Sequence, residues 1–242
     1  MLSALELLEA FLPEARLRKA RRLLKRHLAG FSELRDTQVQ LLRLAQLLPA
    51  LPDLQGFEQA LRRRERRCIR QARRRIKRVA PSRLERQLRR LRAELKKCWN
   101  QPLRRRCIEA VNTAFGEVVK RRRRVTPEDT ATIHRTRVAF KHFRYMVEGL
   151  HGALRGVTQQ RLRAMQRYQA MMGEIQDHEV LLTSLREFVR KERLARDVAR
   201  TWFAELERPR QALVARYLRN ADALAKFWPL PGPARRPTRR LP

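Results

Sequence analysis

Apolar residues recur at helical spacing along almost the whole chain, and this pattern limits the fold more than any other feature. Only 8 of the 242 residues are glycine, and no alternating, β-branched run indicates a strand. Each helical residue advances about 100° around the axis, so one side of a helix recurs every three to four positions. In the segment 57–79 the apolar side gathers Phe57, Leu61, Cys68, Ala72, Ile76 and Val79. Later stripes contain Leu84, Leu88, Leu91 and Leu95, then Ile108, Val111, Phe115 and Val118. We therefore expect an all-α protein of long amphipathic helices packed as bundles.

Turn signals divide these helices. The breaks predicted from Gly and Pro lie near Pro13, Gly30, Pro81, Pro102 and the segments 49–56 and 152–156. A further break is predicted near Asp177. Thr126 and Asp129 fit a capping box with Pro127 at the first helical position, which predicts a helix start there.

The sequence also contains an internal repeat. The stretch FSELRDTQV from Phe31 matches MGEIQDHEV from Met172, which aligns Asp36 with Asp177. We therefore expect two copies of one helical unit, an antiparallel bundle of long helices, over residues 1–125 and 126–228. Residues 229–242 are rich in Pro and Arg and have no apolar periodicity, which predicts an extended tail.

The charge balance calls for an anionic partner. Lys and Arg number 58 against 24 Asp and Glu, a net charge of +34, while 43% hydrophobic residues still suffice for a core. On the segment 57–79, the side opposite the apolar stripe carries Arg63, Arg66, Arg70, Arg73 and Lys77.

The segment 133–150, IHRTRVAFKHFRYMVEGL, separates a core face from a cationic face. An arc of about 80° holds His134, Arg137, Lys141, Arg144 and Glu148. The opposite side holds Ala139, Phe140, Phe143, Met146, Val147 and Leu150. Its cations recur every 5 to 6 Å or so along the axis, comparable with successive phosphates of an extended chain. A solvated basic face is the plain alternative, but Glu148 is the only carboxylate on the arc, so self-neutralisation is not available.

These residues resemble a known family. The run of His134, Arg137, Val138, Lys141, Arg144, Tyr145 and Glu148 is similar to the signature H-x-x-R-V-x-x-K-x-x-R-Y-x-x-E of CHAD domains, the conserved histidine α-helical domains. MGEIQD from Met172 resembles the L-G-x-x-x-D element of that family, and FSELRD resembles a degenerate first copy. Glu9 aligns with Glu148, which predicts that the chain starts about halfway along a first histidine helix.

The resemblance implies two pseudo-symmetric bundles around a basic central channel that binds inorganic polyphosphate without catalysis. Its polyanion ligands would be His134, Arg137, Lys141 and Arg144, joined less securely by Lys25 and Arg26 in the first copy and Arg167 in the second. The helix with Arg66, Arg70, Arg73 and Lys77 would add a supporting positive wall.

Two other functions fit parts of the sequence. A protein with this charge could instead bind RNA or DNA non-specifically, although its aromatic residues fall on apolar faces and predict no base-stacking platform. The acid pairs Glu33 with Asp36 and Glu174 with Asp177 could be read as metal or acid–base sites of a phosphatase. We expect them instead to cap helices or bind arginines, and we expect no metal and no cofactor.

The remaining features concern location. Cys68, Cys98 and Cys107 form no C-x-x-C pair and predict neither a disulfide framework nor a zinc site. Residues 1–13 have no basic n-region, and no apolar stretch approaches the length of a membrane span. We expect a cytoplasmic protein, associated with polyphosphate granules if it binds that polymer, and the oligomeric state stays open.

Overall fold

The computed structural model describes residues 5, 7–9, 12–28, 31–78, 81–98, 101–152, 154 and 156–228. Within these residues all regular structure is helical, which confirms the predicted all-α class. The helices are α2 (Glu14–Leu28), α3 (Phe31–Leu47), α4 (Gln55–Arg78), α5 (Pro81–Cys98), α6 (Gln101–Arg122), α7 (Thr130–Leu150), α8 (Gln159–Glu192) and α9 (Arg196–Asn220). Two 3-10 helices, η1 (Pro52–Leu54) and η2 (Ala221–Lys226), precede α4 and follow α9.

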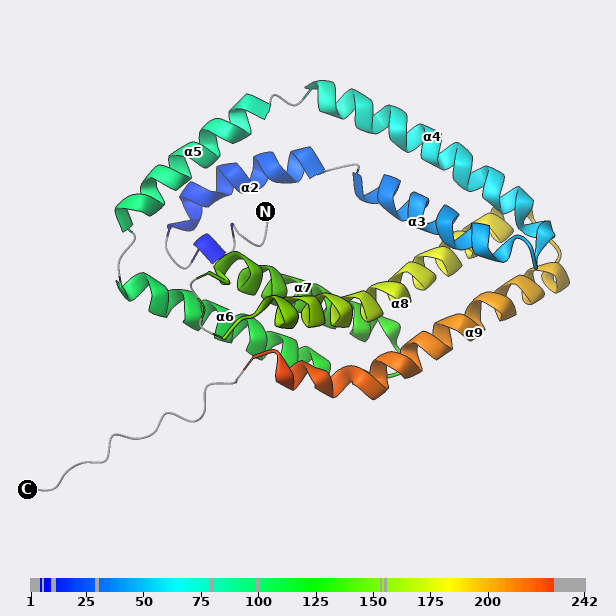
Figure 1. Cartoon of the computed structure of the whole chain (residues 1–242). Helices are drawn as coiled ribbons and strands as arrows, with labels where there is room; N and C mark the ends of the chain where they lie inside the picture. Colours follow the sequence, from blue (N-terminus) through cyan, green and yellow to red (C-terminus); the bar gives the residue numbers. More distant parts are fainter. Residues whose placement is uncertain are drawn as a thin grey trace, which may run out of the picture.

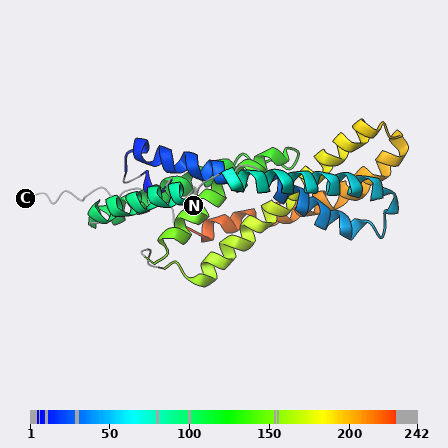
Figure 2. The ribbon, with the colours of Figure 1, turned by 90° about the horizontal axis from the view of Figure 1, so that it is seen from above.

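The helices form a flattened, oblong molecule that is broad in Figure 1 and thin in Figure 2. In Figure 1, α4 and α5 run along one edge and α6 and α9 along the other, with α2, α3, α7 and α8 between them. Figure 2 shows the same chain from above, with α4 and α5 lying along its length. The side chains at the centre therefore come from helices far apart in the sequence.

The largest hydrophobic core surrounds α7. The apolar face predicted for the segment 133–150 is buried here, with Phe140, Phe143 and Val147 fully enclosed. Phe115 of α6 packs on Phe143, and Tyr168 of α8 packs on Phe140, with ring centroids 5.0 and 4.9 Å apart. Such aromatic contacts hold α7 firmly between its neighbours.

Two smaller cores complete the fold. One joins α3 and α4 to the second half of α8 and the start of α9, through residues such as Leu44, Leu61 and Leu185. The other joins α2 to α5 around Leu17 and Leu91. Helix α8 thus takes part in two cores. Because it packs against α7 in one core and against α3 in the other, it fixes the position of α3 relative to α7.

Two predicted helix boundaries are wrong. The break expected near Asp177 does not exist, because α8 continues from Gln159 to Glu192. The aligned stretch of the first copy does change helix, since α2 ends at Leu28 and α3 begins at Phe31. The difference follows the sequence: Gly30, which disfavours helix, is replaced by Met171 in the second copy.

The second error concerns the start of α7. The helix begins at Thr130, and the N-cap is Asp129, whose side chain accepts a hydrogen bond from the backbone N–H of Ala131 at 3.0 Å. Thr126 therefore lies outside the helix that it was expected to cap. The predicted boundaries near Pro13, Gly30 and Pro81 and at residues 49–56 and 152–156 are confirmed.

The periodicity of the segment 57–79 is confirmed along most of α4. Phe57, Leu61, Cys68 and Ala72 are buried, but Ile76 is 57% exposed, because no core extends to the last turn of α4. Val79 lies outside the described residues. Cys68 and Cys107 are buried, free thiols.

The predicted division at residue 126 falls between two helices that share a core. Residues of α6 and α7 contribute side by side to the hydrophobic cluster around Phe143. The two-bundle organisation and the domain boundaries therefore stay predictions. The tail at 229–242 lies outside the described residues.

Candidate functional site

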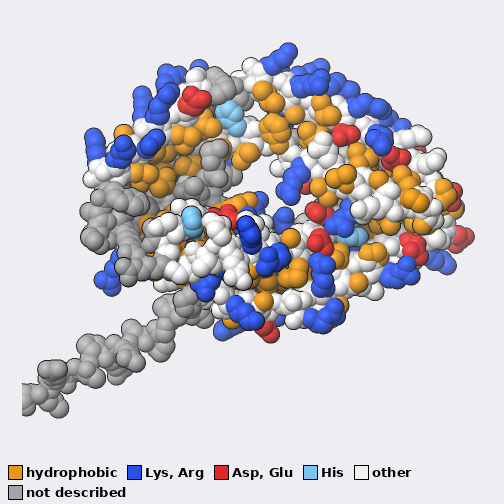
Figure 3. Space-filling model, viewed as in Figure 1, with side chains coloured by type: hydrophobic (Ala, Val, Ile, Leu, Met, Phe, Trp, Pro, Cys, Tyr) orange, Lys and Arg blue, Asp and Glu red, His pale blue; other side chains and the backbone are white. Residues whose placement is uncertain are grey.

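The cationic face of α7 borders a pocket of about 680 Å³. His134, Arg137 and Lys141 line it from α7, Arg35 and Asp36 from α3, and Asp177 from α8. Figure 3 shows the surface hollowed between α2 and α3 on one side and α7 and α8 on the other, with Lys and Arg side chains at its border. The two aligned stretches that begin at Phe31 and at Met172 thus reach α7, the helix with His134, in one place.

The basic groups of this pocket form no ion pairs with acidic side chains among the described residues. In the described part of the chain, no ion pair involves Arg35, His134, Arg137 or Lys141. His134 Nδ1 and Arg137 Nε are buried atoms without a hydrogen-bond partner. A buried polar atom without a partner lowers the stability of the fold, so both atoms carry such a cost in the structure.

Arg137 lies over the glycine of the second repeat. Its Nε is 3.6 Å from the position that a Cβ would occupy on Gly173, and apart from the adjoining residues and backbone of α8 no other described atom comes within 4 Å of that position. The absence of a side chain at Gly173 leaves the surface of α8 open beneath the guanidinium. This contact connects the two sequence elements on which the family resemblance was based.

Two carboxylates accompany the cations. Burial raises the pKa of Asp177 above its ordinary value, while the nearby Arg43, Arg137 and Arg35 act in the opposite direction and Asp36 adds to the rise. Against the three cations of the lining, Arg35, Arg137 and Lys141, there are thus two acids. Asp177 interacts electrostatically with the nearby arginines, and both carboxylates would repel a bound anion.

Arg144 has a different environment from the other three residues of the arc. Its side chain is 8% exposed and forms an ion pair with Glu148. Its Nε donates to Gln169 Oε1 of α8 at 2.8 Å, and its guanidinium carbon lies 4.4 Å from the ring centre of Tyr145. Gln166 also donates to Glu148, at 3.2 Å. Arg144 therefore joins α7 to α8 and does not line the pocket.

The remaining predicted ligands also lie outside this pocket lining. Lys25 and Arg26 are exposed in the last turn of α2, shortly before Leu28, which does line it. Arg167 is exposed on α8 and lines another pocket. The row on α4 is exposed and borders neither pocket: Arg66, Arg70, Arg73 and Lys77.

The glutamate of each acid pair binds an arginine, as expected. Glu33 pairs with Arg64 of α4 at 3.1 Å, and Glu174 pairs with Arg216 of α9 at 2.7 Å. These ion pairs join α3 to α4 and α8 to α9. Among the described residues, no group of three or more His, Cys, Asp or Glu side chains could hold a metal ion.

His178 directly follows the position near Asp177 where a helix break was predicted. Because α8 continues through that position, His178 lies in the middle of the helix and is 6% exposed. Its Nε2 lies 3.3 Å from a guanidinium nitrogen of Arg43, and burial, followed by Arg43, lowers its pKa.

Sequence reasoning missed Arg35. The alignment places it opposite Gln176, a neutral residue, so it carried no repeat signal. Only the packing of α3 beside α8 brings it to the histidine helix. The sequence signal that could have identified Arg35 is its position directly before Asp36, which aligns with Asp177.

Comparisons with known proteins agree with the motifs. The family model described as the CHAD domain matches residues 1–186, more than half of the chain. No curated protein and no solved structure matches. In the described segments, every helix is too short or too polar to cross a membrane.

Proposed function

This chain belongs to the CHAD domain family, and from that premise we propose that it binds inorganic polyphosphate, an extended phosphate polyanion, in the pocket between α3, α7 and α8. One observation carries the proposal. His134, Arg137 and Lys141 reach one pocket from a single helix face, and Arg35 faces it from α3. None of these four is neutralised by an ion pair in the described residues.

The spacing of the three α7 groups favours a chain over a single phosphate. Positions 134, 137 and 141 are separated by about 4.5 and 6 Å along the helix axis. Successive phosphates of one extended chain could therefore contact successive side chains. Arg137 offers a planar fork to phosphate oxygens, and Lys141 offers a point charge.

The other predicted ligands take indirect roles in this proposal. Arg144 is a positioning residue, because its contacts with Glu148 and Gln169 fix the face that presents Arg137 and Lys141. Lys25 and Arg26 are exposed near the pocket rim and add to the positive potential around it. We propose binding without turnover, in the cytoplasm, where long phosphate chains would be the substrate of other proteins.

The test compares two variants with the same change of charge. Arg137→Gln with Lys141→Gln removes two pocket cations, and Arg92→Gln with Lys96→Gln removes two exposed cations of α5. Isothermal titration with polyphosphate of about 100 units should show roughly 30-fold or more weakening for the pocket variant, because each charge-assisted contact contributes about 1.5 kcal/mol or more. The α5 variant should bind within about threefold of the original protein, since exposed charges contribute little.

Equal weakening in both variants would contradict the pocket assignment and leave only general charge attraction. Far-UV circular dichroism of all proteins checks that helicity is unchanged. Phosphate release in the presence of Mg²⁺ should stay at the level of the protein-free control. Turnover that disappears with Arg137→Gln would replace binding by catalysis as the function of this pocket.

The cationic row on α4 favours a second candidate function, non-specific nucleic-acid binding. Arg66, Arg70, Arg73 and Lys77 are exposed on one side of α4 and have no acidic partner in the described chain. The row lies along one exposed side of a single helix, so it could contact phosphates of a duplex, which would bind by backbone charge alone.

A competition titration separates the two functions. Substituting the α4 row with Gln at positions 66, 70, 73 and 77 should weaken binding of duplex DNA and leave polyphosphate binding nearly unchanged. If polyphosphate and DNA displace each other equally at matched phosphate concentration, and both depend on the α4 row, the pocket is not a specific polyphosphate site.

A further inference from the structure

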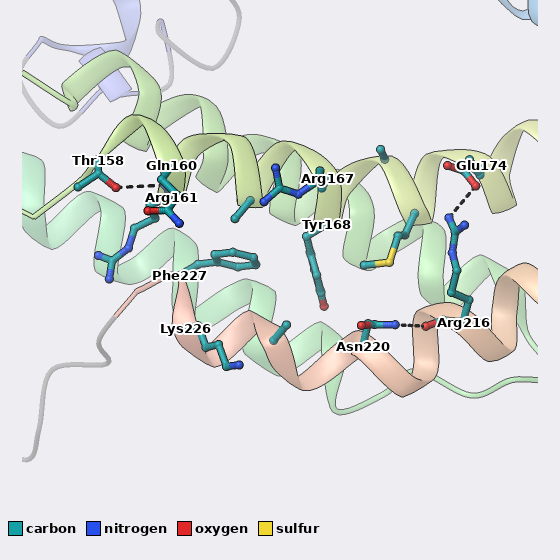
Figure 4. A pocket seen from close by; sticks show the side chains of 14 residues that line it. Thr158, Gln160, Arg161, Arg167, Tyr168, Glu174, Arg216, Asn220, Lys226 and Phe227 are labelled. Carbon is teal, nitrogen blue, oxygen red and sulfur yellow. Dashed lines mark hydrogen bonds and ion pairs between the residues drawn. The ribbon is translucent and has the colours of Figure 1, made fainter.

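A second pocket, of about 750 Å³, lies between the first half of α8 and the end of α9 with η2 (Figure 4). It shares no lining residue with the pocket beside α7. Its volume falls in the range of sites for small molecules, about 300–1,000 Å³. Arg167, which sequence reasoning assigned to the polyphosphate ligands, lines this pocket instead.

The floor of this second pocket is apolar and fixed. Ala164, Tyr168, Met171 and Phe227 contribute to it. Tyr168 is held in place because its hydroxyl donates to the carbonyl oxygen of Ala221 at 2.9 Å, and its ring meets Phe227 edge to face at 5.4 Å between centroids. A polymer of phosphate alone has no apolar part to cover such a floor.

Cations surround the floor without acidic partners. Arg161, Arg167 and Lys226 line the pocket, and no ion pair in the described chain involves them. In Figure 4, Arg161 and Lys226 lie around Phe227 toward one end of the pocket. Three cations exceed what a single carboxylate or phosphate monoester requires, so the ligand should carry several negative charges.

The opposite end offers hydrogen-bonding groups. Glu174 and Arg216 form their ion pair there, at 2.7 Å. Asn220 donates from its amide nitrogen to the carbonyl oxygen of Arg216 at 2.8 Å, which leaves its amide oxygen as an acceptor. A hydrocarbon chain would gain nothing from these groups, whereas the polar edge of a heterocycle would.

We propose that this second pocket binds a nucleoside polyphosphate. The phosphates lie against Arg161, Arg167 and Lys226, and the base covers the apolar floor with its edge toward Asn220 and Glu174. The site differs in residues and in ligand from the polyphosphate pocket, so the two proposals stand or fall separately.

The test uses ATP and the full chain. Isothermal titration is carried out on Arg137→Gln with Lys141→Gln, in which the polyphosphate pocket is disabled, and ATP should still bind with one-to-one stoichiometry. Tripolyphosphate, which lacks the nucleoside, should bind at least about fivefold more weakly, because the apolar floor stays in contact with water.

Two further variants in that background locate the ATP. Arg161→Gln with Arg167→Gln and Lys226→Gln should lower ATP affinity by about tenfold or more. Its matched control removes two arginines and one lysine from α5, Arg90→Gln with Arg92→Gln and Lys96→Gln, and should bind ATP within about threefold of the background. Ala164→Trp fills the floor without a change of charge and should abolish ATP binding. When Ala164→Trp is made in the otherwise unsubstituted chain, polyphosphate binding should persist.

Four outcomes would overturn the proposal. ATP could fail to bind, or could bind only while Arg137 and Lys141 are present, which would make it another guest of the first pocket. Equal affinity for ATP and tripolyphosphate would mean that the floor is not used. Dodecyl phosphate binding that excludes ATP would assign the floor to an alkyl chain.

Discussion

Arg137 of α7 lies over Gly173 of α8, with its Nε 3.6 Å from the place of a Cβ on that glycine. The two residues are 36 positions apart and belong to the two elements that carry the family resemblance. In the first copy of the repeat, the residue aligned with Gly173 is Ser32, which lines the same pocket. A Cβ on Gly173 would be in ordinary contact with Arg137, so the position leaves no room beneath the guanidinium for a side chain larger than that of alanine.

Substitutions at Gly173 should separate stability from binding. Gly173→Ala adds a methyl group at ordinary contact distance from Arg137, and it should raise the free energy of unfolding by about 0.5–1 kcal/mol, because glycine disfavours the middle of a helix. Gly173→Leu should displace the guanidinium and weaken polyphosphate binding by roughly tenfold. Urea denaturation and isothermal titration measure the two effects. If Gly173→Leu leaves the affinity for polyphosphate unchanged, Arg137 does not bind polyphosphate from the conformation seen here.

Asp177 should oppose the ligand. It lies in the pocket, and burial raises its pKa, so its ionised form is disfavoured in the folded protein. Because any ionised carboxylate at this place in the pocket repels bound phosphates, Asp177→Asn should raise polyphosphate affinity by about fivefold, through removal of roughly 1 kcal/mol of repulsion. Glu192→Gln, which removes an exposed acid at the end of α8, is the matched control. Weaker binding in Asp177→Asn would mean that the carboxylate holds the arginines in their binding positions.

Arg144 should contribute to stability more than to direct binding. Arg144→Gln leaves Glu148 and Gln169 without their partner, and we expect a loss of about 2 kcal/mol of unfolding free energy, reduced from the value for fully buried pairs because Glu148 is 26% exposed. Arg137→Gln should change stability by less than about 1 kcal/mol. If Arg144→Gln is fully stable and yet does not bind polyphosphate, Arg144 is a direct ligand.

The sequence predicted well those features that depend on one helix at a time. Periodicity alone placed Phe140, Phe143 and Val147 in the core, and the structure confirms all three. The same 100° rule placed His134, Arg137 and Lys141 on one face, which they share at the pocket. Both results require only that the segment be a helix with one buried side.

The features that were missed depend on the neighbouring helix. Arg144 lies on the same 80° arc as Lys141, but Gln169 of α8 and Glu148 draw it into the contact between helices. Arg35 enters the pocket because α3 packs beside α8, and His178 is buried for the same reason. No spacing rule within one segment states which element will cover a face. Arg167 illustrates the same limit, since its partners in the second pocket are contributed by α9 and η2.

The buried His178 predicts a loss of stability in mild acid. Burial and the adjacent Arg43 lower its folded pKa below the ordinary 6.5, so the unfolded chain binds the proton first as pH falls. Stability should therefore decrease from about pH 7 toward pH 5, with a slope of at most about 1.4 kcal/mol per pH unit. Asp177 has the opposite effect on stability: because its folded pKa is raised, it adds stability as pH falls toward that pKa.

Thermal denaturation across this pH range tests the histidine. His178→Gln should flatten the decrease between pH 7 and 5, whereas the exposed His151→Gln should not change it. The other charged groups around His178 are Arg210, Glu174 and Glu179, and these stay in place in both variants. An unaltered pH dependence in His178→Gln would assign the effect to another group.

The dependence of affinity on salt should distinguish ligands from positioning residues. Each phosphate contact releases counterions, so removal of one direct contact should lower the slope of log affinity against log salt concentration by about one. Arg137→Gln and Lys141→Gln should each show that change, because both side chains line the pocket without an ion pair in the described chain. Arg144→Gln should weaken binding with an unchanged slope, because its charge is already paired with Glu148. A reduced slope for Arg144→Gln, equal to that of Arg137→Gln, would place the guanidinium of Arg144 on the phosphate chain and would require α7 and α8 to rearrange when the ligand binds.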